Sequence, residues 1–315
     1  MSKFVNVSTT APRQPDFSSL PKSFSVYERE IKAHLKTLLY EVLPESPDLI
    51  VFPECSNRYV PNTRDEMREF YTYIGEGVVD YLKGLAKENN TNIAYCAHRL
   101  VGLPKEAPFR NSTTYIGRNG EILGVYDKNY VMSSLEYDTG VAYGDKAELI
   151  ELDFGKVATA ICFDLNFDEL LDKYAKQKPD IVVFSSAYHG GEMRQAHWAY
   201  KCRSFFVSSI IDKPSAILNP YGEIIASTTN YTRTASAKIN LDYALCHMDY
   251  NMEKIILAKQ KYGNRLSVYD PGYFGSVMLS YLDNDKTVGD VMTEFGINTL
   301  DAYLDGARLH RSSHI

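Results

Sequence analysis

The chain has 315 residues with 44 % hydrophobic content, which is enough to bury a sizeable core in one or two domains. Its net charge of −6 is spread along the chain without a basic stripe, which excludes the surface that a nucleic-acid partner requires. Residues 1–14 lack the apolar core of a secretory signal, and no stretch approaches the ~20 apolar residues that span a bilayer. Five cysteines without a C-x-x-C pair favour a reducing compartment. We therefore expect one large domain in a soluble, cytoplasmic protein without a membrane partner.

The first part of the chain alternates between patterns typical of helices and of buried strands. Apolar residues at helical spacing predict a helix over residues 27–43. The apolar run at 48–52 predicts a strand that is buried on both faces and is followed by Glu54. The same two patterns recur as a helix from about 67 to 88 and a strand near 92–97.

Two hairpins are predicted next. Strand-like runs at 113–116 and 122–126 flank an Asn-Gly turn, and runs at 149–152 and 157–161 flank a Phe-Gly pair. Hairpins join antiparallel strands, whereas strands that are separated by helices usually run parallel. The predicted sheet is therefore mixed.

The second half of the chain repeats features of the first. A helix around 167–177 leads into Pro-Asp-Ile-Val-Val-Phe at 179–184, which nearly repeats Pro-Asp-Leu-Ile-Val-Phe at 47–52. Gly-Glu-Ile likewise occurs at 120–122 and at 222–224, each time after a strand-like run. Two such halves would each form a mixed sheet with helices on one face and bury the other sheet face against its counterpart. We therefore expect an α/β fold, a four-layer α-β-β-α sandwich with two mixed sheets.

The C-terminal region has a weaker periodicity. Residues 250–261 still predict a helix, whereas residues 283–315 are polar and lack a core of their own. We therefore predict one domain over residues 1–282. Residues 283–315 are predicted to form a tail or arm that lies on another subunit or in solvent.

Three predicted strands end near a reactive side chain, namely Glu54, Lys128 and Cys162. Strand ends converge at the rim of a sheet, so these side chains are candidates for one site. A cysteine attacks a carbonyl as the thiolate, and it needs a base for its proton and a positive or hydrogen-bonding group for the oxyanion. Taken singly, Cys162 is more typical of a small core residue, and Glu54 with Lys128 of a surface ion pair. Their combination and order favour catalysis.

The segments around these residues resemble the signatures of the nitrilase superfamily of carbon-nitrogen hydrolases. The matches are an apolar strand running into Pro-Glu at 49–54, Tyr-Asp-Lys at 126–128 and Ile-Cys-Phe-Asp at 161–164, in the family's order. The resemblance covers about residues 1–280 and implies the same four-layer sandwich. It also implies hydrolysis of a small-molecule amide or N-carbamoyl substrate without a metal or organic cofactor. Family members usually pair through the region equivalent to residues 192–211, which implies a homodimer or a higher homo-oligomer.

The resemblance also implies a role for each site residue. Glu54 would accept the thiol proton, and Cys162 would attack the amide carbon to form a thioester. Lys128 and the backbone N–H of Phe163 would stabilise the oxyanion, and Glu54 would then protonate the departing amine and activate the water that releases the acid. Some amidases and carbamoylases of the family place a second glutamate eight positions after the lysine, where it orients the lysine and helps to hold the substrate. Glu136 matches that position.

Loops near the strand ends supply candidate substrate-binding residues, although each of these taken singly is more typical of packing. The candidates are Tyr59, Tyr130, Phe163, Tyr188 and His189. Phe and Asp follow Cys162, whereas Trp and Glu typically follow the nucleophile of true nitrilases, so the resemblance argues against nitriles as substrates. The branch of the superfamily stays open.

Metal and nucleotide chemistry are not expected. His310 and His314 form an H-x-x-x-H pair, but it lies in the polar tail without a third ligand or a glutamate base. No Gly-rich phosphate loop is present in the sequence. The alternatives to amide hydrolysis are nitrile hydrolysis, acyl transfer to an amine, and a catalytically silent binding or scaffold protein.

Overall fold

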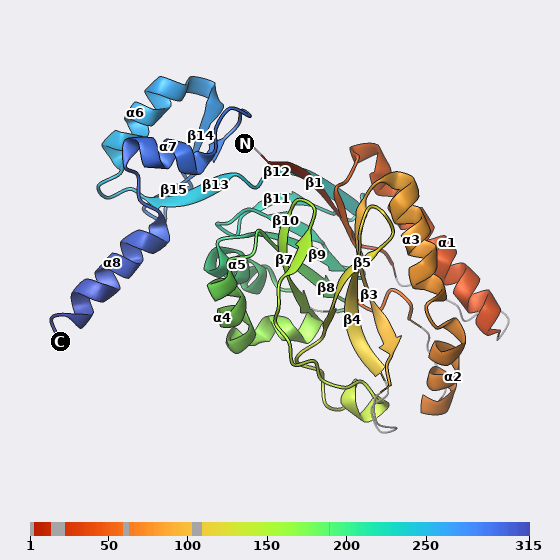
Figure 1. Cartoon of the computed structure of the whole chain (residues 1–315). Coiled ribbons are helices and arrows are strands. Elements are labelled where there is room, and N and C mark those ends of the chain that lie inside the picture. The colour runs from red at the N-terminus through yellow and green to blue at the C-terminus, as the bar shows by residue number, and fades with distance from the viewer. Residues whose placement is uncertain (1–2, 14–22, 59–62, 103–108, 189) are drawn as a thin grey trace. The chain divides into compact units, whose positions relative to one another are not determined.

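The computed structural model describes residues 3–13, 23–58, 63–102, 109–188 and 190–315 (Figure 1). The chain divides into two compact units. The main unit spans Asn6–Ala237, and the C-terminal unit spans Lys238–Ile315 together with the first residues of the chain. Within the described ranges, no helix combines the length and the apolar character needed to cross a bilayer.

The first sheet of the main unit has six strands in the order β12-β1-β2-β3-β4-β5. Strands β1 to β3 run parallel, and β3 to β5 run antiparallel. The hairpin between β4 and β5 turns at Gly120, where φ is 81° and a Cβ would lie only 3.0 Å from the carbonyl oxygen of Lys83. The strands are β1 (Phe4–Thr10), β2 (Leu49–Val51), β3 (Asn92–Leu100), β4 (Phe109–Ile116), β5 (Ile122–Asp127) and β12 (Thr234–Asn240).

The second sheet has six strands in the order β11-β10-β9-β8-β7-β6. Strands β7 to β9 run parallel, and the β6/β7, β9/β10 and β10/β11 pairs are antiparallel. Both sheets are therefore mixed, as predicted. The strands are β6 (Ile150–Leu152), β7 (Gly155–Ile161), β8 (Ile181–Ser186), β9 (Phe205–Ile210), β10 (Ala216–Leu218) and β11 (Ile224–Ser227).

The two sheets repeat one strand order. Strands β1 to β5 of the first sheet correspond in order to β7 to β11 of the second. The two Pro-Asp repeats lead into β2 and β8, the second strand of each series. Gly120 and Gly222 turn the last hairpin of each series with φ values of 81° and 82°. This correspondence agrees with the two related halves that the sequence predicts.

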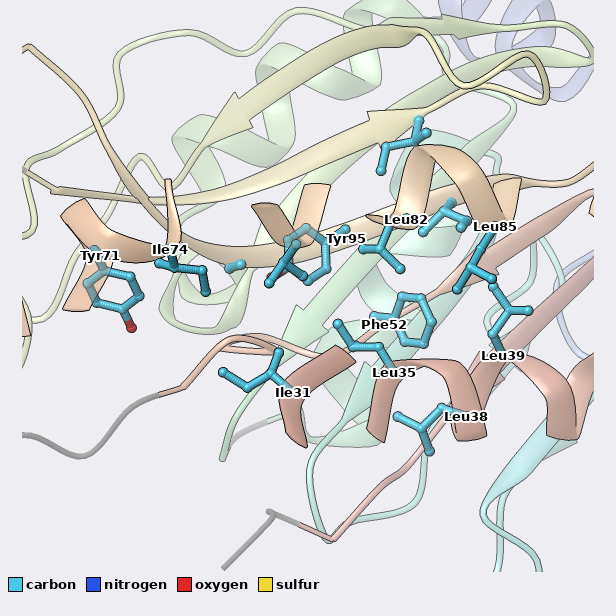
Figure 2. Packing of buried hydrophobic residues seen from close by; sticks show 14 of the residues in the cluster. Ile31, Leu35, Leu38, Leu39, Phe52, Tyr71, Ile74, Leu82, Leu85 and Tyr95 are labelled. Atoms are coloured by element: carbon cyan, nitrogen blue, oxygen red, sulfur yellow. The ribbon is translucent and has the colours of Figure 1, made fainter. Parts of the chain in front are cut away.

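Three helices cover the outer face of the first sheet (Figure 1). They are α1 (Phe24–Val42), α2 (Arg64–Ile74) and α3 (Gly77–Asn89). Ile31, Leu35 and Leu39 of α1 are buried in one apolar cluster with Phe52 (Figure 2). The prediction of one continuous helix over 67–88 is wrong, because the chain turns at Gly75, whose φ of 46° lies outside the right-handed helical region.

Two helices, α4 (Asp168–Gln177) and α5 (Glu192–Cys202), lie on the other side of the main unit (Figure 1). They bury Leu170, Tyr174 and Trp198, and the Trp198 indole N–H donates a hydrogen bond to the Leu165 carbonyl at 3.0 Å. With the helices of the first side, they complete the predicted α-β-β-α sandwich.

The facing surfaces of the two sheets contact each other through hydrogen-bonded polar side chains. The Ser185 hydroxyl donates to the Phe52 carbonyl at 2.8 Å, and the Ser209 hydroxyl donates to the Thr10 carbonyl at 2.7 Å. The first contact holds the end of β2 beside the end of β8, and the second holds the end of β1 beside β9. The segments that follow β2 and β8 therefore lie close together, and both contribute to the candidate site.

The C-terminal unit contains an antiparallel sheet in the order β13-β15-β14 and an apolar core of its own. Val288, Val291 and Met292 belong to this core, so the segment after residue 283 is not a coreless tail and the boundary lies near 238. Polar residues between these apolar ones hid the pattern. The elements are β13 (Tyr243–His247), α6 (Met252–Tyr262), β14 (Leu266–Tyr269), β15 (Ser276–Tyr281), α7 (Val288–Phe295) and α8 (Leu300–Ser312).

Candidate active site

Cys162 lies where β7 ends and a short 3-10 helix, η3 (Cys162–Asn166), begins. Its φ of 47° is uncommon for a residue other than glycine and requires support from the surrounding structure. The Asp164 carboxylate accepts hydrogen bonds from the backbone N–H groups of Ile161 and Tyr130, at 3.0 and 2.7 Å. It also accepts one from the Tyr126 hydroxyl at 2.8 Å. Asp164 therefore ties the turn that carries the thiol to the segment after β5.

Glu54 follows β2, and its residue is only 3 % exposed. Its Oε1 accepts hydrogen bonds from the Lys128 ammonium at 2.9 Å and from the Asn111 amide at 2.7 Å. Its Oε2 accepts the backbone N–H of Ala187 at 2.8 Å. The Cys162 thiol lies near enough to Glu54 for the carboxylate to raise the pKa of the thiol. The carboxylate is therefore held in one orientation beside the thiol.

Lys128 follows β5 and is buried. Its ammonium lies 2.9 Å from Glu54 Oε1, and 2.9 and 2.8 Å from Oε1 and Oε2 of Glu136. The Met132 backbone N–H donates to Glu136 Oε2 at 2.8 Å and orients it. The structure thus brings the side chains of Glu54, Lys128, Glu136 and Cys162 into one cluster.

Burial and neighbouring charges set the protonation of this cluster. Burial raises the pKa of Glu54, but the charge of Lys128 and the hydrogen bonds to the carboxylate outweigh it, so the pKa lies below its usual value. Burial lowers the pKa of Lys128, but the two glutamates raise it well above its usual value. Burial, and then the charge of Glu54, raise the pKa of Cys162 to about 11. At neutral pH the Cys162 thiol is therefore protonated and lies near the Glu54 carboxylate, which can accept its proton.

An aromatic cluster lies in the segments next to Lys128 and Cys162. Tyr130 stacks on Phe167, with ring centroids 3.6 Å apart and an interplanar angle of 5°. Phe163 meets Phe167 edge-on at 5.1 Å. Two of the predicted substrate-binding residues, Tyr130 and Phe163, therefore lie within two positions of Lys128 and Cys162 in the sequence. Both of their rings contact the ring of Phe167.

The other predicted substrate-binding residues are placed differently. Tyr188 is 71 % exposed and follows Ala187, whose backbone contacts Glu54. Tyr59 and His189 lie outside the described residues.

Two contributors to the cluster were missed by the sequence analysis, namely the Asn111 amide and the Ala187 backbone N–H. Asn111 lies inside β4, in a run of polar residues at 110–114 that does not single out any one side chain as part of a site. A backbone group carries no residue-specific signal at all. Three or more His, Cys, Asp or Glu side chains in an arrangement that could hold a metal ion do not occur among the described residues.

Comparison with known proteins places the chain in a family. The model of the Carbon-nitrogen hydrolase family matches residues 29–207, more than half of the chain. Omega-amidase NIT2 of Danio rerio is 24 % identical over 236 residues, which are 66 % of this chain and 82 % of that protein.

Solved structures share the fold. The Caenorhabditis elegans NitFhit protein superposes with a TM-score of 0.65 at 15 % identity, over 76 % of this chain and 61 % of that chain. A carbon-nitrogen hydrolase from Helicobacter pylori G27 superposes with a TM-score of 0.63 at 17 % identity, over 76 % of this chain and 90 % of that chain. The sequence signatures, the sandwich and the family match agree, and the chain is a member of the carbon-nitrogen hydrolase family.

Proposed function

We propose that the protein hydrolyses the C–N bond of a small non-peptide amide or N-carbamoyl compound through a thioester on Cys162. The products would be a carboxylic acid, or a carbamic acid that decomposes, and ammonia or an amine. The observation that carries this proposal is the buried cluster in which Lys128 donates a hydrogen bond to Glu54, and Glu54 lies near enough to Cys162 to raise the pKa of its thiol.

The first stage forms the thioester. Glu54 takes the thiol proton while the Cys162 sulfur bonds to the carbonyl carbon, and the carbonyl oxygen becomes an oxyanion. Lys128 and the Phe163 backbone N–H stabilise that negative charge. The C–N bond then breaks, and the proton held by Glu54 goes to the departing nitrogen.

The second stage regenerates the thiol. Glu54, again a carboxylate, takes a proton from water while the water oxygen bonds to the thioester carbon. The C–S bond breaks, the acid leaves, and the proton returns from Glu54 to the Cys162 sulfur. Glu136 holds the Lys128 ammonium in place through both stages by its paired contacts at 2.8 and 2.9 Å.

The proposed substrate class follows from the site's chemistry and from the relatives. The matched relative is an omega-amidase, which supports a primary carboxamide as the reacting group. The stacked Tyr130 and Phe167 and the adjoining Phe163 provide flat apolar surface next to the nucleophile, and we assign substrate contact to Tyr130 and Phe163. We also propose substrate contact for Tyr59, Tyr188 and His189.

The decisive experiment incubates the protein with half-amides of dicarboxylic acids, simple aliphatic amides, N-carbamoyl amino acids and the matching nitriles. We expect ammonia and the free acid from at least one amide or carbamoyl compound, and a covalent acyl adduct in the intact mass that maps to Cys162. Addition of hydroxylamine separates hydrolysis from acyl transfer, since a transferase would yield mainly the hydroxamate. Turnover of nitriles alone, or no adduct and no product with the whole panel, would contradict the proposal.

We also propose that two copies of the chain associate through α5 and the adjoining edge of the second sheet. A groove of about 870 Å³ lies there, lined by α5 residues and by β10 and β11 residues. Apolar side chains around it are exposed, with Met193 at 80 % and Ile224 at 47 %. Exposed apolar surface of this kind supports burial against a partner, and the family resemblance makes that partner a second copy.

Substitution Met193→Glu is expected to dissociate the dimer, because it puts a charge where apolar surface would be buried. Sedimentation velocity at micromolar concentration would show a dimer for the wild type and a monomer for this variant. Met252→Glu, at a methionine of the C-terminal unit that is 53 % exposed, is the control and should remain dimeric. A monomeric wild-type protein would exclude the proposed association.

A further inference from the structure

Asn111 on β4 contacts the candidate site through both its side chain and its backbone. Its amide nitrogen donates to Glu54 Oε1 at 2.7 Å and to Glu136 Oε1 at 3.0 Å. Its backbone carbonyl accepts the Lys128 backbone N–H at 2.9 Å. Asn111 itself is 1 % exposed. One asparagine therefore contacts three of the residues to which the proposed function assigns chemistry.

The orientation of the amide is also set. The Asn111 carbonyl oxygen lies 3.8 Å from the Cys96 sulfur, within reach of the thiol as a donor. Both N–H groups of the amide are used, one toward each carboxylate. A flipped amide would direct its oxygen at two carboxylates, which would be repulsive.

The hydrogen bonds close a ring. Lys128 donates to Glu54 and Glu136 from one side, and Asn111 donates to the same Oε1 atoms of both from the other side. Two carboxylates that share one ammonium would repel each other in a buried site. The partial positive charges on the Asn111 N–H groups offset this repulsion from the side opposite Lys128 and keep both carboxylates in place.

We propose that Asn111 is a positioning residue of the active site that holds the Glu54 and Glu136 carboxylates in register on either side of Lys128. Without the amide, Glu54 Oε1 keeps only its contact with Lys128 and can turn away from the thiol. The inference rests on the proposed function, in which Glu54 moves the protons and Glu136 steadies the lysine. It assigns Asn111 no contact with the substrate.

The role predicts a change in the titration of Glu54. A hydrogen bond from a neutral donor favours the carboxylate, so its removal raises the pKa of Glu54 and the carboxylate is lost at a higher pH than in the wild type. Among the described residues, the other titratable groups near Glu54 are Lys128, Glu136, Cys162, Cys55, Cys96 and His98. All of them are retained in the variants below, so they contribute equally to each titration.

The test is a ¹³C NMR titration of the full chain labelled at the glutamate δ-carbons, with the Glu54 signal assigned by its disappearance in Glu54→Gln. We expect the Glu54 midpoint to move to higher pH in Asn111→Ala. Asn111→Asp, which keeps the side-chain shape but replaces the donor with a carboxyl group, should move it further. The second variant also keeps the test informative if the alanine variant does not fold.

Asn92→Ala is the matched control. Asn92 is 1 % exposed, and its amide donates to the Asp48 carbonyl at 2.9 Å and to Asp153 Oδ1 at 2.8 Å. Both of these partners lie outside the site, so the Glu54 midpoint should not change. An unchanged midpoint in the Asn111 variants, or an equal shift in Asn92→Ala, would overturn the inference.

Kinetics provide the second readout. With a substrate that the wild type hydrolyses, kcat/KM of Asn111→Ala should fall roughly 10- to 100-fold, the loss expected for the hydrogen bond to the charged Glu54 carboxylate. The acid limb of its pH profile should move to higher pH. The NMR titration needs no turnover, so failure of the substrate panel would count against the proposed function alone, whereas an unchanged Glu54 midpoint would count against Asn111 alone.

Discussion

Cys162→Ala is expected to lower hydrolysis by about 10⁴-fold or more, because no other atom of the cluster can form the acyl-enzyme bond. The change removes one sulfur atom from a buried position, so the free energy of unfolding should fall by only about 1 kcal/mol. Steady-state ammonia release measures the first effect, and urea unfolding measures the second.

Cys202→Ala is the control for this prediction. Cys202 is a free, buried cysteine at the end of α5, so its substitution loses the same volume without touching the cluster. It should keep wild-type activity. Substantial ammonia release by Cys162→Ala would show that Cys162 is not the nucleophile. Loss of activity in both variants would show that the loss comes from disturbed packing and not from removal of the nucleophile.

Lys128→Met is expected to abolish turnover and to destabilise the main unit by about 3–5 kcal/mol at neutral pH. The substitution leaves the Glu54 and Glu136 side chains in the buried cluster without the cation that both contact. Loss of that cation raises the pKa of Glu54. A carboxyl group whose folded-state pKa is raised destabilises the fold as pH rises through that pKa. The loss of unfolding free energy in Lys128→Met should therefore become smaller on acidification toward pH 5.

Trp198 allows this measurement to report on the main unit alone, because it is the single tryptophan of the sequence and is buried in α5. Urea unfolding followed by its fluorescence at pH 8 and pH 5 gives the two free energies. Lys83→Met, which breaks a partly exposed pair with Asp80, should change stability by at most about 1 kcal/mol at either pH. A stability of Lys128→Met equal to that of Lys83→Met would contradict the buried ion cluster.

Local patterns in the sequence predicted the layered part of the fold. Apolar spacing over residues 27–43 predicted α1, and apolar runs predicted the buried strands β2 and β8. Such patterns work because each element must bury one face or stripe, whatever its partner is. The break at Gly75 and the strand β1 were missed, since one glycine and a short polar-rich strand change a periodic pattern very little.

The C-terminal unit shows a different limit. Its helix α7 buries Val288, Val291 and Met292, but against residues that come from α6, β13 and β15. A stripe this short does not predict a core by its own pattern. The core forms because short apolar stripes from several elements pack together, and which elements pack together is decided by the tertiary structure.

By itself, the sequence determined which residue types end the strands and in what order, because Glu54, Lys128 and Cys162 each follow an apolar strand in a recognisable local motif. Only the tertiary structure decided what lies between them. The Asn111 amide and the Ala187 backbone N–H reach Glu54 from strands that are distant in the chain. The first of these hydrogen bonds depends on strand order within one sheet and the second on the packing of the two sheets, and a linear pattern records the elements but not their contacts.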